Sequence, residues 1–201
     1  MPDAPGLELI RGEIEQDHPG AVLDTSFDRD QPALIVDPAQ ILAVLAWLRD
    51  APGQGYRFLS SLHAADYLPA EPRFAVHYEL LNRDRVERVR VKAMLEDPSA
   101  AGPVAGVGGA LRAGHGPSST PPTPAPPTEE ELPEIDSCVE LFPTAEFQER
   151  EVYDFFGIVF RGHPDLTRIL LPEDYVGWPQ RRDFPVGGEP VTFTYNERNY
   201  G

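Results

Sequence analysis

His163 and Asp165 are the residues whose types and spacing best suit chemistry in this chain. An imidazole beside a carboxylate can relay a proton or bind a metal ion. Pro164 lies between them and fixes an extended kink, so the two side chains do not share a helical face, and no third metal ligand accompanies them. We expect a structural role, in which Asp165 caps the turn that begins at Leu166. A stand-alone acid–base enzyme built on this pair is the alternative.

Other patterns that could bind a cofactor are incomplete. Cys138 is the single cysteine, so it can form no internal disulfide, and it is expected to be a buried apolar filler. The glycine run at 106–109 follows a predicted strand, but the last glycine of a dinucleotide fingerprint is replaced by Leu111. No phosphate loop, catalytic triad order, iron–sulfur cysteine set or flavin fingerprint is present in the sequence. We expect the chain to hold no metal, flavin or nucleotide.

Arg150 has two explanations. It lies four residues from both Glu146 and Asp154 on a predicted helix, so an ion pair within the helix would account for it. Alternatively, the acidic residues around it, Glu149, Glu151 and Asp154, face a neighbouring protein.

Three further arginines, Arg168, Arg181 and Arg182, stand close together in a chain that is acidic overall. Guanidinium groups in such a setting usually have assigned carboxylate partners. Those partners lie either within the segment or across an interface. The candidates within the segment are Asp165, Asp174 and Asp183.

Hydrophobic spacing predicts the elements that position these residues. Helices are expected over residues 7–16, after the Asp37-Pro38 start with Ile41, Leu42, Leu45 and Leu48 on one face, and over 146–156, where Gly157 ends the helix. Strands are expected over 33–36, 56–62, 74–81, 88–95 and 158–160, and residues 135–142 are expected to return to the sheet or its edge. In the fourth strand the apolar residues alternate with Arg88, Arg90 and Lys92, which indicates a sheet buried on one side. Those basic residues form either a solvated face or a surface for an acidic partner.

The sequence therefore predicts an α+β fold, in which a small mixed sheet carries helices on one face and is followed by an extended, irregular C-terminal segment. The expected divisions are an α/β body at 1–97, a flexible Pro/Gly-rich linker at 98–133, a strand, helix and extended segment at 134–186, and a tail at 187–201. The linker has almost no large apolar residue, so it cannot bury enough surface to offset its ordering entropy. In the tail, Val191, Phe193 and Tyr195 alternate as a short strand would.

Composition limits the classes of partner that the chain could bind. The formal net charge is -16, and binding to nucleic acid or to an anionic lipid surface would require an excess of Lys and Arg. The longest apolar run, at 41–48, is far short of the roughly 20 residues that cross a bilayer, and no signal peptide pattern is present at the N-terminus. We expect a soluble, cytosolic chain with protein partners, unless a partner holds it at a membrane.

The stretch 149–185 also resembles the signature of a known family, the 30-kDa subunit of respiratory complex I, the NADH-quinone oxidoreductase of bacteria. The positions that match this signature are Glu149-Arg150-Glu151, Asp154, Phe156-Gly157-Ile158, Phe160, Gly162 to Leu166, Arg168-Ile169-Leu170, Pro172, Asp174, Gly177, Pro179, Arg181 and Asp183-Phe184-Pro185. The sequence departs from it at Gln180, where Leu is usual, and at Arg182, where Lys is common. The linker is also longer than the family's usual connection.

The resemblance implies an accessory, cofactor-free subunit in the peripheral arm of a proton-translocating NADH-quinone oxidoreductase, on the cytoplasmic side of the cell membrane. FMN, iron–sulfur clusters and quinone would belong to other subunits. The partners it implies are chiefly the 49-kDa-type subunit and the subunit that carries the terminal iron–sulfur cluster. An equivalent subunit of an energy-converting hydrogenase, or of a complex with another electron donor, is the nearby alternative. The expected interface residues are Glu149, Arg150, Glu151, Asp154, Phe156, Gly157, His163, Pro164, Asp165, Arg168, Asp174, Arg181, Arg182 and Asp183.

Overall fold

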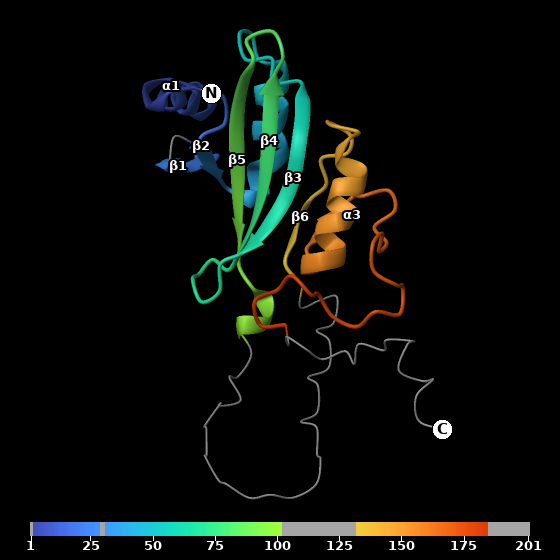
Figure 1. Cartoon of the computed structure of the whole chain (residues 1–201). Helices are drawn as coiled ribbons and strands as arrows, with labels where there is room; N and C mark the ends of the chain where they lie inside the picture. The colour runs from blue at the N-terminus through green and yellow to red at the C-terminus, as the bar shows by residue number, and fades with distance from the viewer. Residues whose placement is uncertain (1, 29–30, 102–131, 185–201) are drawn as a thin grey trace, which may run out of the picture.

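A five-stranded mixed sheet forms the centre of the protein (Figure 1). The computed structural model describes residues 2–28, 31–101 and 132–184. The sheet order is β1-β2-β5-β4-β3, where β2 and β5 run parallel and the other neighbours run antiparallel. The strands are β1 (Val22–Asp28), β2 (Gln31–Val36), β3 (Phe58–Asp66), β4 (Phe74–Asn82) and β5 (Glu87–Leu95). This arrangement confirms the predicted α+β class.

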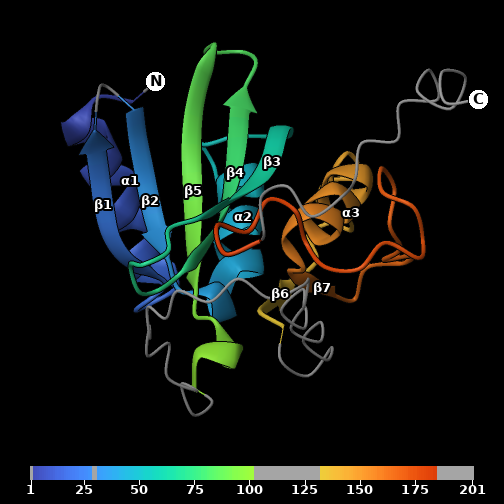
Figure 2. The same ribbon diagram turned by 60° about the horizontal axis from the view of Figure 1, so that its bottom comes forward.

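Two helices, α1 (Ala4–Asp17) and α2 (Ile41–Asp50), cover one face of the sheet (Figure 2). Each begins where the sequence supplies an aspartate cap: the Asp3 carboxylate accepts a hydrogen bond from the amide of Gly6, and that of Asp37 accepts one from Ala39, in a 3-10 turn at Pro38–Gln40 that leads into α2. The buried side chains of α2 recur at helical spacing, with Val44 in place of the predicted Leu42. They are Ile41, Val44, Leu45 and Leu48.

The sheet is buried on one side, as its alternation predicts. Along β5, Val89 and Val91 are fully buried under the helices, whereas Arg88, Arg90 and Lys92 point to the other face. The connection between β3 and β4 crosses that second face (Figure 2). The five-stranded sheet therefore presents a polar surface opposite its core.

Two features of the strands differ from the predictions. Strand β1 was not expected, because its sequence, VLDTSFD, carries too few apolar residues to stand out; it is an edge strand that pairs only with β2. Residues 134–136 do not return to the main sheet. They form β6 (Glu134–Asp136), which pairs in parallel with β7 (Val159–Arg161) in a separate two-stranded sheet, because the turn at Gly157 brings β7 alongside it.

Most of the predicted linker lies outside the described residues, and so do the predicted tail and its alternating Val191, Phe193 and Tyr195. The described ends of the linker are held by the body. Residues Pro98–Ala101 form a 3-10 turn after β5, and Leu132 is buried on the way into β6.

Candidate functional site

The helix α3 (Ala145–Phe156) positions the motif-rich stretch of the sequence. Its inner face packs against β3 and buries Glu149, Val152 and Phe156. Gly157 ends it in the left-handed conformation, with φ of 67°, as the sequence predicts. The outer stripe, at one-turn spacing, consists of residues 147, 150, 151 and 154. The segment after β7, residues 162–184, has no helix or strand and runs along this side of α3 (Figure 1).

Asp154 is the main anchor of that segment. Its carboxylate is fully buried and accepts hydrogen bonds from the amides of Ile169, Leu170 and Leu171, at 3.2, 2.8 and 2.9 Å. It also forms an ion pair with Arg168, whose Nη1 lies 2.8 Å from Oδ1. Burial opposes ionisation, but these amides and the guanidinium outweigh it, so the pKa of Asp154 falls below its ordinary value.

Two arginines tie the backbone of the segment to α3. Arg168 donates to the carbonyl oxygens of Asp154 and Gly177, each at 3.0 Å. Arg150 donates to the carbonyl oxygens of Thr167 and Arg168, each at 3.1 Å, and to the Thr167 hydroxyl at 3.0 Å. Arg150 makes no ion pair among the described residues, so the first of its two explanations, an ion pair within the helix, is wrong.

His163 and Asp165 take structural roles that differ from the predicted one. The Nε2 atom of His163 lies 3.0 Å from the carbonyl oxygen of Glu146, and its Nδ1 accepts the amide of Asp165 at 3.0 Å. His163, rather than the Asp165 carboxylate, therefore fixes this turn. Asp165 is exposed.

Trp178 closes the segment over the end of α3. A Cβ atom on Gly157 would lie 2.4 Å from the indole, so only glycine fits beneath this ring. The guanidinium of Arg181 lies 4.8 Å from the Trp178 ring centroid and 4.9 Å from that of Phe74, and its Nε donates to the carbonyl oxygen of Phe156 at 2.7 Å. Burial lowers the pKa of Arg181.

Arg73 joins the end of the segment to the sheet. It lies directly before β4, is nearly fully buried, and pairs with Asp66 at 2.8 Å, with Asp97 at 2.7 Å and with Asp183 at 2.7 Å. Burial disfavours its charge, but the three carboxylates outweigh it and raise the pKa of Arg73. Arg182 adds a bond from its amide to Asp66, at 2.8 Å.

Glu149 is buried on the inner face of α3 without a cation partner among the described residues. Its carboxylate accepts the Ser137 hydroxyl at 2.6 Å and the amide of Cys138 at 2.8 Å. Burial raises the pKa of Glu149 despite these bonds. Cys138 is buried and free, as expected, and burial raises the pKa of its thiol.

The structure divides the fourteen expected interface residues into two groups. Five of them are buried within the chain, where helix packing, the Asp154 anchor and the Trp178 stack account for them, and their contact with another protein stays a prediction: Glu149, Asp154, Phe156, Gly157 and Arg181. The other nine are partly or fully exposed, and their contact with another protein stays a prediction: Arg150, Glu151, His163, Pro164, Asp165, Arg168, Asp174, Arg182 and Asp183.

Sequence reasoning missed Arg73, Asp66 and Asp97, which hold the end of the segment. No local spacing identifies them, because Arg73 and Asp183 are 110 residues apart. Sequence reasoning placed Asp154 among acidic residues that face a neighbouring protein. A carboxylate that is surrounded by charged residues in the sequence can also be an internal anchor.

Three large apolar side chains are exposed on α3 and on the segment that covers it. Phe147 is 59% exposed, Leu170 61% and Val176 61%. Phe147 and Asp154 share the outer stripe of α3, and Leu170 follows the backbone that Asp154 holds. The in-chain bonds thus present apolar groups outward on one side of the molecule.

Within the described residues, no group of three or more His, Cys, Asp or Glu side chains could hold a metal ion. In the same part of the chain no helix is long and apolar enough to cross a membrane.

Comparison with known proteins gives a consistent result. The model of the family "Respiratory-chain NADH dehydrogenase, 30 Kd subunit" matches residues 34–106 and 123–190. A protein of Herpetosiphon aurantiacus, named as a subunit of NADH-quinone oxidoreductase, is 40% identical over 164 residues, which cover 82% of this chain and 77% of that protein. A protein of the same name from Roseiflexus castenholzii is 38% identical over 89% of this chain and 84% of its own length.

Among solved structures, a chain of the membrane-bound sulfane sulfur reductase, an archaeal respiratory membrane complex, aligns with a TM-score of 0.58 over 89% of this chain at 20% identity. That likeness shows a shared fold. The family match and the relatives both cover most of the sequence, and the family match includes the segment anchored on Asp154. The chain therefore belongs to the family of the 30-kDa subunit of respiratory-chain NADH dehydrogenase, the NADH-quinone oxidoreductase.

Proposed function

We propose that this chain is an accessory, cofactor-free subunit that holds neighbouring subunits of a proton-translocating NADH-quinone oxidoreductase together, with α3 and residues 162–184 as its main binding surface. The partners we assign to it are the 49-kDa-type subunit and the subunit that carries the terminal iron–sulfur cluster. The electron-transfer chemistry would then belong to other subunits, which bind FMN, iron–sulfur clusters and quinone. The complex would hold this chain on the cytoplasmic side of the membrane.

The observation that carries the proposal is the exposure of Phe147, Leu170 and Val176 on a surface that the chain's own bonds hold in place. Exposed apolar groups gain free energy when a partner covers them, at about 25 cal/mol per Å². A segment that is already ordered also loses less conformational entropy on binding than a free one. An irregular segment anchored in this way suits a binding surface.

The relatives' names support NADH as the electron donor over the hydrogenase alternative, because proteins named as this subunit of NADH-quinone oxidoreductase match at 32–40% identity. The sulfane sulfur reductase likeness, at 20% identity, bears on the fold only.

The test replaces Leu170 by Glu in the native complex. We expect the Leu170→Glu chain to fold but to be lost from the purified membrane complex, with NADH–quinone reductase activity falling in proportion to the complex lost. The matched control is Leu9→Glu, which places the same charge on the exposed side of α1, where Leu9 is 69% exposed. Full assembly of the Leu170→Glu complex, or equal loss in both variants, would contradict the proposal.

A further inference from the structure

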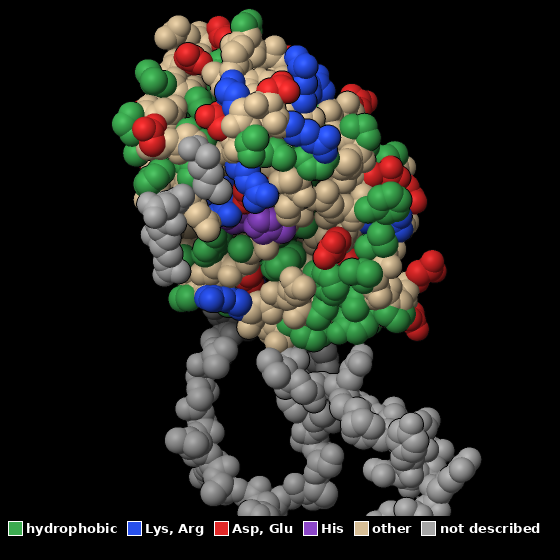
Figure 3. Space-filling view, turned by 45° about the horizontal axis from the view of Figure 1, so that its top comes forward, with side chains coloured by type: hydrophobic (Ala, Val, Ile, Leu, Met, Phe, Trp, Pro, Cys, Tyr) green, Lys and Arg blue, Asp and Glu red, His purple; other side chains and the backbone are tan. Residues whose placement is uncertain are grey.

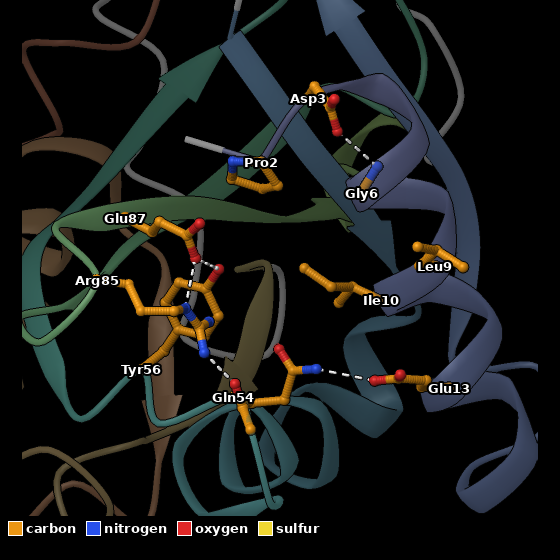
Figure 4. A pocket seen from close by; sticks show the side chains of 11 residues that line it. Pro2, Asp3, Gly6, Leu9, Ile10, Glu13, Gln54, Tyr56, Arg85 and Glu87 are labelled. Carbon is orange, nitrogen blue, oxygen red and sulfur yellow. Dashed lines mark hydrogen bonds and ion pairs between the residues drawn. The ribbon is translucent and has the colours of Figure 1, made fainter.

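Among the hollows outside the α3 surface that hold polar groups, the first satisfies them internally. It has a volume of about 550 Å³ and lies between α1 and the turn that joins β4 to β5 (Figure 4). Arg85 bonds Glu87 at 2.7 Å, and the Gln54 amide bonds Glu13 at 2.8 Å. Because these groups are paired with one another, nothing in this hollow calls for a ligand.

The second hollow lies on the open face of the sheet, over β2 and β5, and has a volume of about 290 Å³. Its floor is apolar, from Ala33 and Ile35. Histidine and basic side chains lie close together on the face seen in Figure 3. The polar residues that line the hollow are Ser26, Gln31, Tyr67, His77, Arg90 and Lys92.

The charge of this hollow is not balanced within the described residues. Arg90 donates through Nε to Glu79, so that pair is neutral. The Lys92 ammonium lies 4.3 Å from the centroid of the Tyr67 ring and makes no ion pair with a carboxylate of the described chain. One positive charge thus remains at the hollow, in a protein whose formal net charge is -16.

His77 gives a second, independent sign of an unmet partner. It is 6% exposed, its ring stacks on His63 at 4.9 Å between centroids, and its Nε2 lies 3.4 Å from the Tyr67 hydroxyl. Its Nδ1 has no hydrogen-bond partner among the described residues. Burial, then His63 and the positive charges of Lys92 and Arg90, lower the pKa of His77 to about 3, so the ring is neutral near pH 7. Buried polar atoms are rarely left unpaired, so the wall of the hollow is unusual at this ring.

We propose that this hollow binds an aspartate or glutamate side chain from an acidic segment of another protein in the same complex, with Lys92 as its ion-pair partner. This assigns a second docking surface, on the open sheet face, that is separate from the α3 surface. The hollow is slightly smaller than small-molecule sites, which span about 300–1,000 Å³. The apolar floor fits the methylene groups of an acidic side chain, and the hydroxyls of Ser26 and Tyr67 can donate to its carboxylate.

A chemical property of the sequence makes the test selective. Lys92 is the only lysine in the 201 residues. A carbodiimide joins an ammonium to a carboxylate in direct contact with it and leaves guanidinium groups unchanged. In the intact membrane complex, treatment followed by proteolysis and mass spectrometry therefore reports the contact of one side chain. The control is Lys92→Arg, which keeps the charge and cannot react.

We expect an amide bond between Lys92 and an Asp or Glu of another subunit, absent in Lys92→Arg, and a loss of about tenfold or more in that subunit's retention in Lys92→Glu. A bond only to this chain's own carboxylates, including Glu129 to Glu131, would overturn the proposal in favour of an internal occupant. Equal acetylation of Lys92 in the free chain and in the complex would also overturn it, because the hollow would then be open to water. So would protection of Lys92 without any such bond, since something other than a carboxylate would fill the site.

Discussion

Asp154 shows how one buried carboxylate can order an irregular segment. A chain without regular structure leaves its amides unpaired, and the Asp154 carboxylate takes three consecutive ones together with the Arg168 guanidinium. Such charge-assisted bonds are about twice as strong as neutral ones. Residues 168–171 therefore have a defined path without a helix or a strand.

We predict that Asp154→Asn destabilises the purified chain by about 3–5 kcal/mol, because Arg168 is left without its partner and at most one carbonyl oxygen replaces two carboxylate oxygens. Urea denaturation at pH 7 measures the loss. The control Asp174→Asn changes an exposed carboxylate and should cost no more than about 0.5 kcal/mol. Since the folded pKa of Asp154 is depressed below its ordinary 3.8, the stability it contributes is present above that pH. The difference between wild type and Asp154→Asn should therefore shrink as the pH falls through the lower, folded pKa.

Local spacing could not identify these partners. It suggested that Arg150 pairs with Glu146 or Asp154 one helical turn away, whereas the guanidinium binds Thr167 and the Arg168 carbonyl oxygen. The competing partners come from a segment that folds back on the helix. Spacing along a helix carries no information about a chain that returns to it from 17 residues later.

At the scale of elements, the segment after β7 packs on the end of α3 where the Trp178 indole lies against Gly157. Gly157 both ends the helix with a positive φ and leaves room for Trp178, whose ring would otherwise overlap a Cβ atom. The Arg181 guanidinium lies 4.8 Å from the centroid of that ring. Its Nε donates to the carbonyl oxygen of Phe156, the last residue of the helix. The end of α3 and the path of the segment are therefore coupled.

We predict that Gly157→Ala costs more stability than Gly162→Ala. Both glycines have positive φ, 67° and 81°, so each alanine should cost about 1 kcal/mol of backbone strain. Only at Gly157 does the new methyl group meet a ring, which should add about 1–3 kcal/mol of overpacking, whereas at Gly162 no atom of the described residues beyond the chain neighbours lies within 4 Å of the corresponding position. Thermal unfolding followed by tryptophan fluorescence compares them. Equal losses would show that the indole does not pack on Gly157.

The regular elements could be predicted because their signals are local. The alternation along β5, the aspartate cap at Asp37 and the glycine at the end of α3 each act within a few residues. Strand β1 was not predicted, because an edge strand needs few apolar residues. The pairing of β6 with β7 was not predicted either, because the fold of the intervening chain determines which strand becomes the parallel partner.

At the scale of the whole molecule, the protein is a half-covered sheet with an anchored segment at one edge. Family membership could be predicted from the signature, since it depends on residue identities. The sequence could not show which of those residues are internal. Glu149 and Asp154 are charged residue types typical of a surface, and only their bonding partners in the structure explain why they are buried. The molecule thus uses part of its signature to build the α3 surface and presents the rest of it outward.

Hydroxyl-radical footprinting tests most directly whether the α3 surface faces other subunits. The modification rates of individual side chains are compared in the free chain and in the intact membrane complex. We predict that Phe147, Leu170 and Val176 become several-fold less reactive in the complex, while Val86, 79% exposed at the far turn between β4 and β5, stays unchanged. Equal reactivity of Phe147, Leu170 and Val176 in both states would contradict the assignment of this surface to a subunit interface.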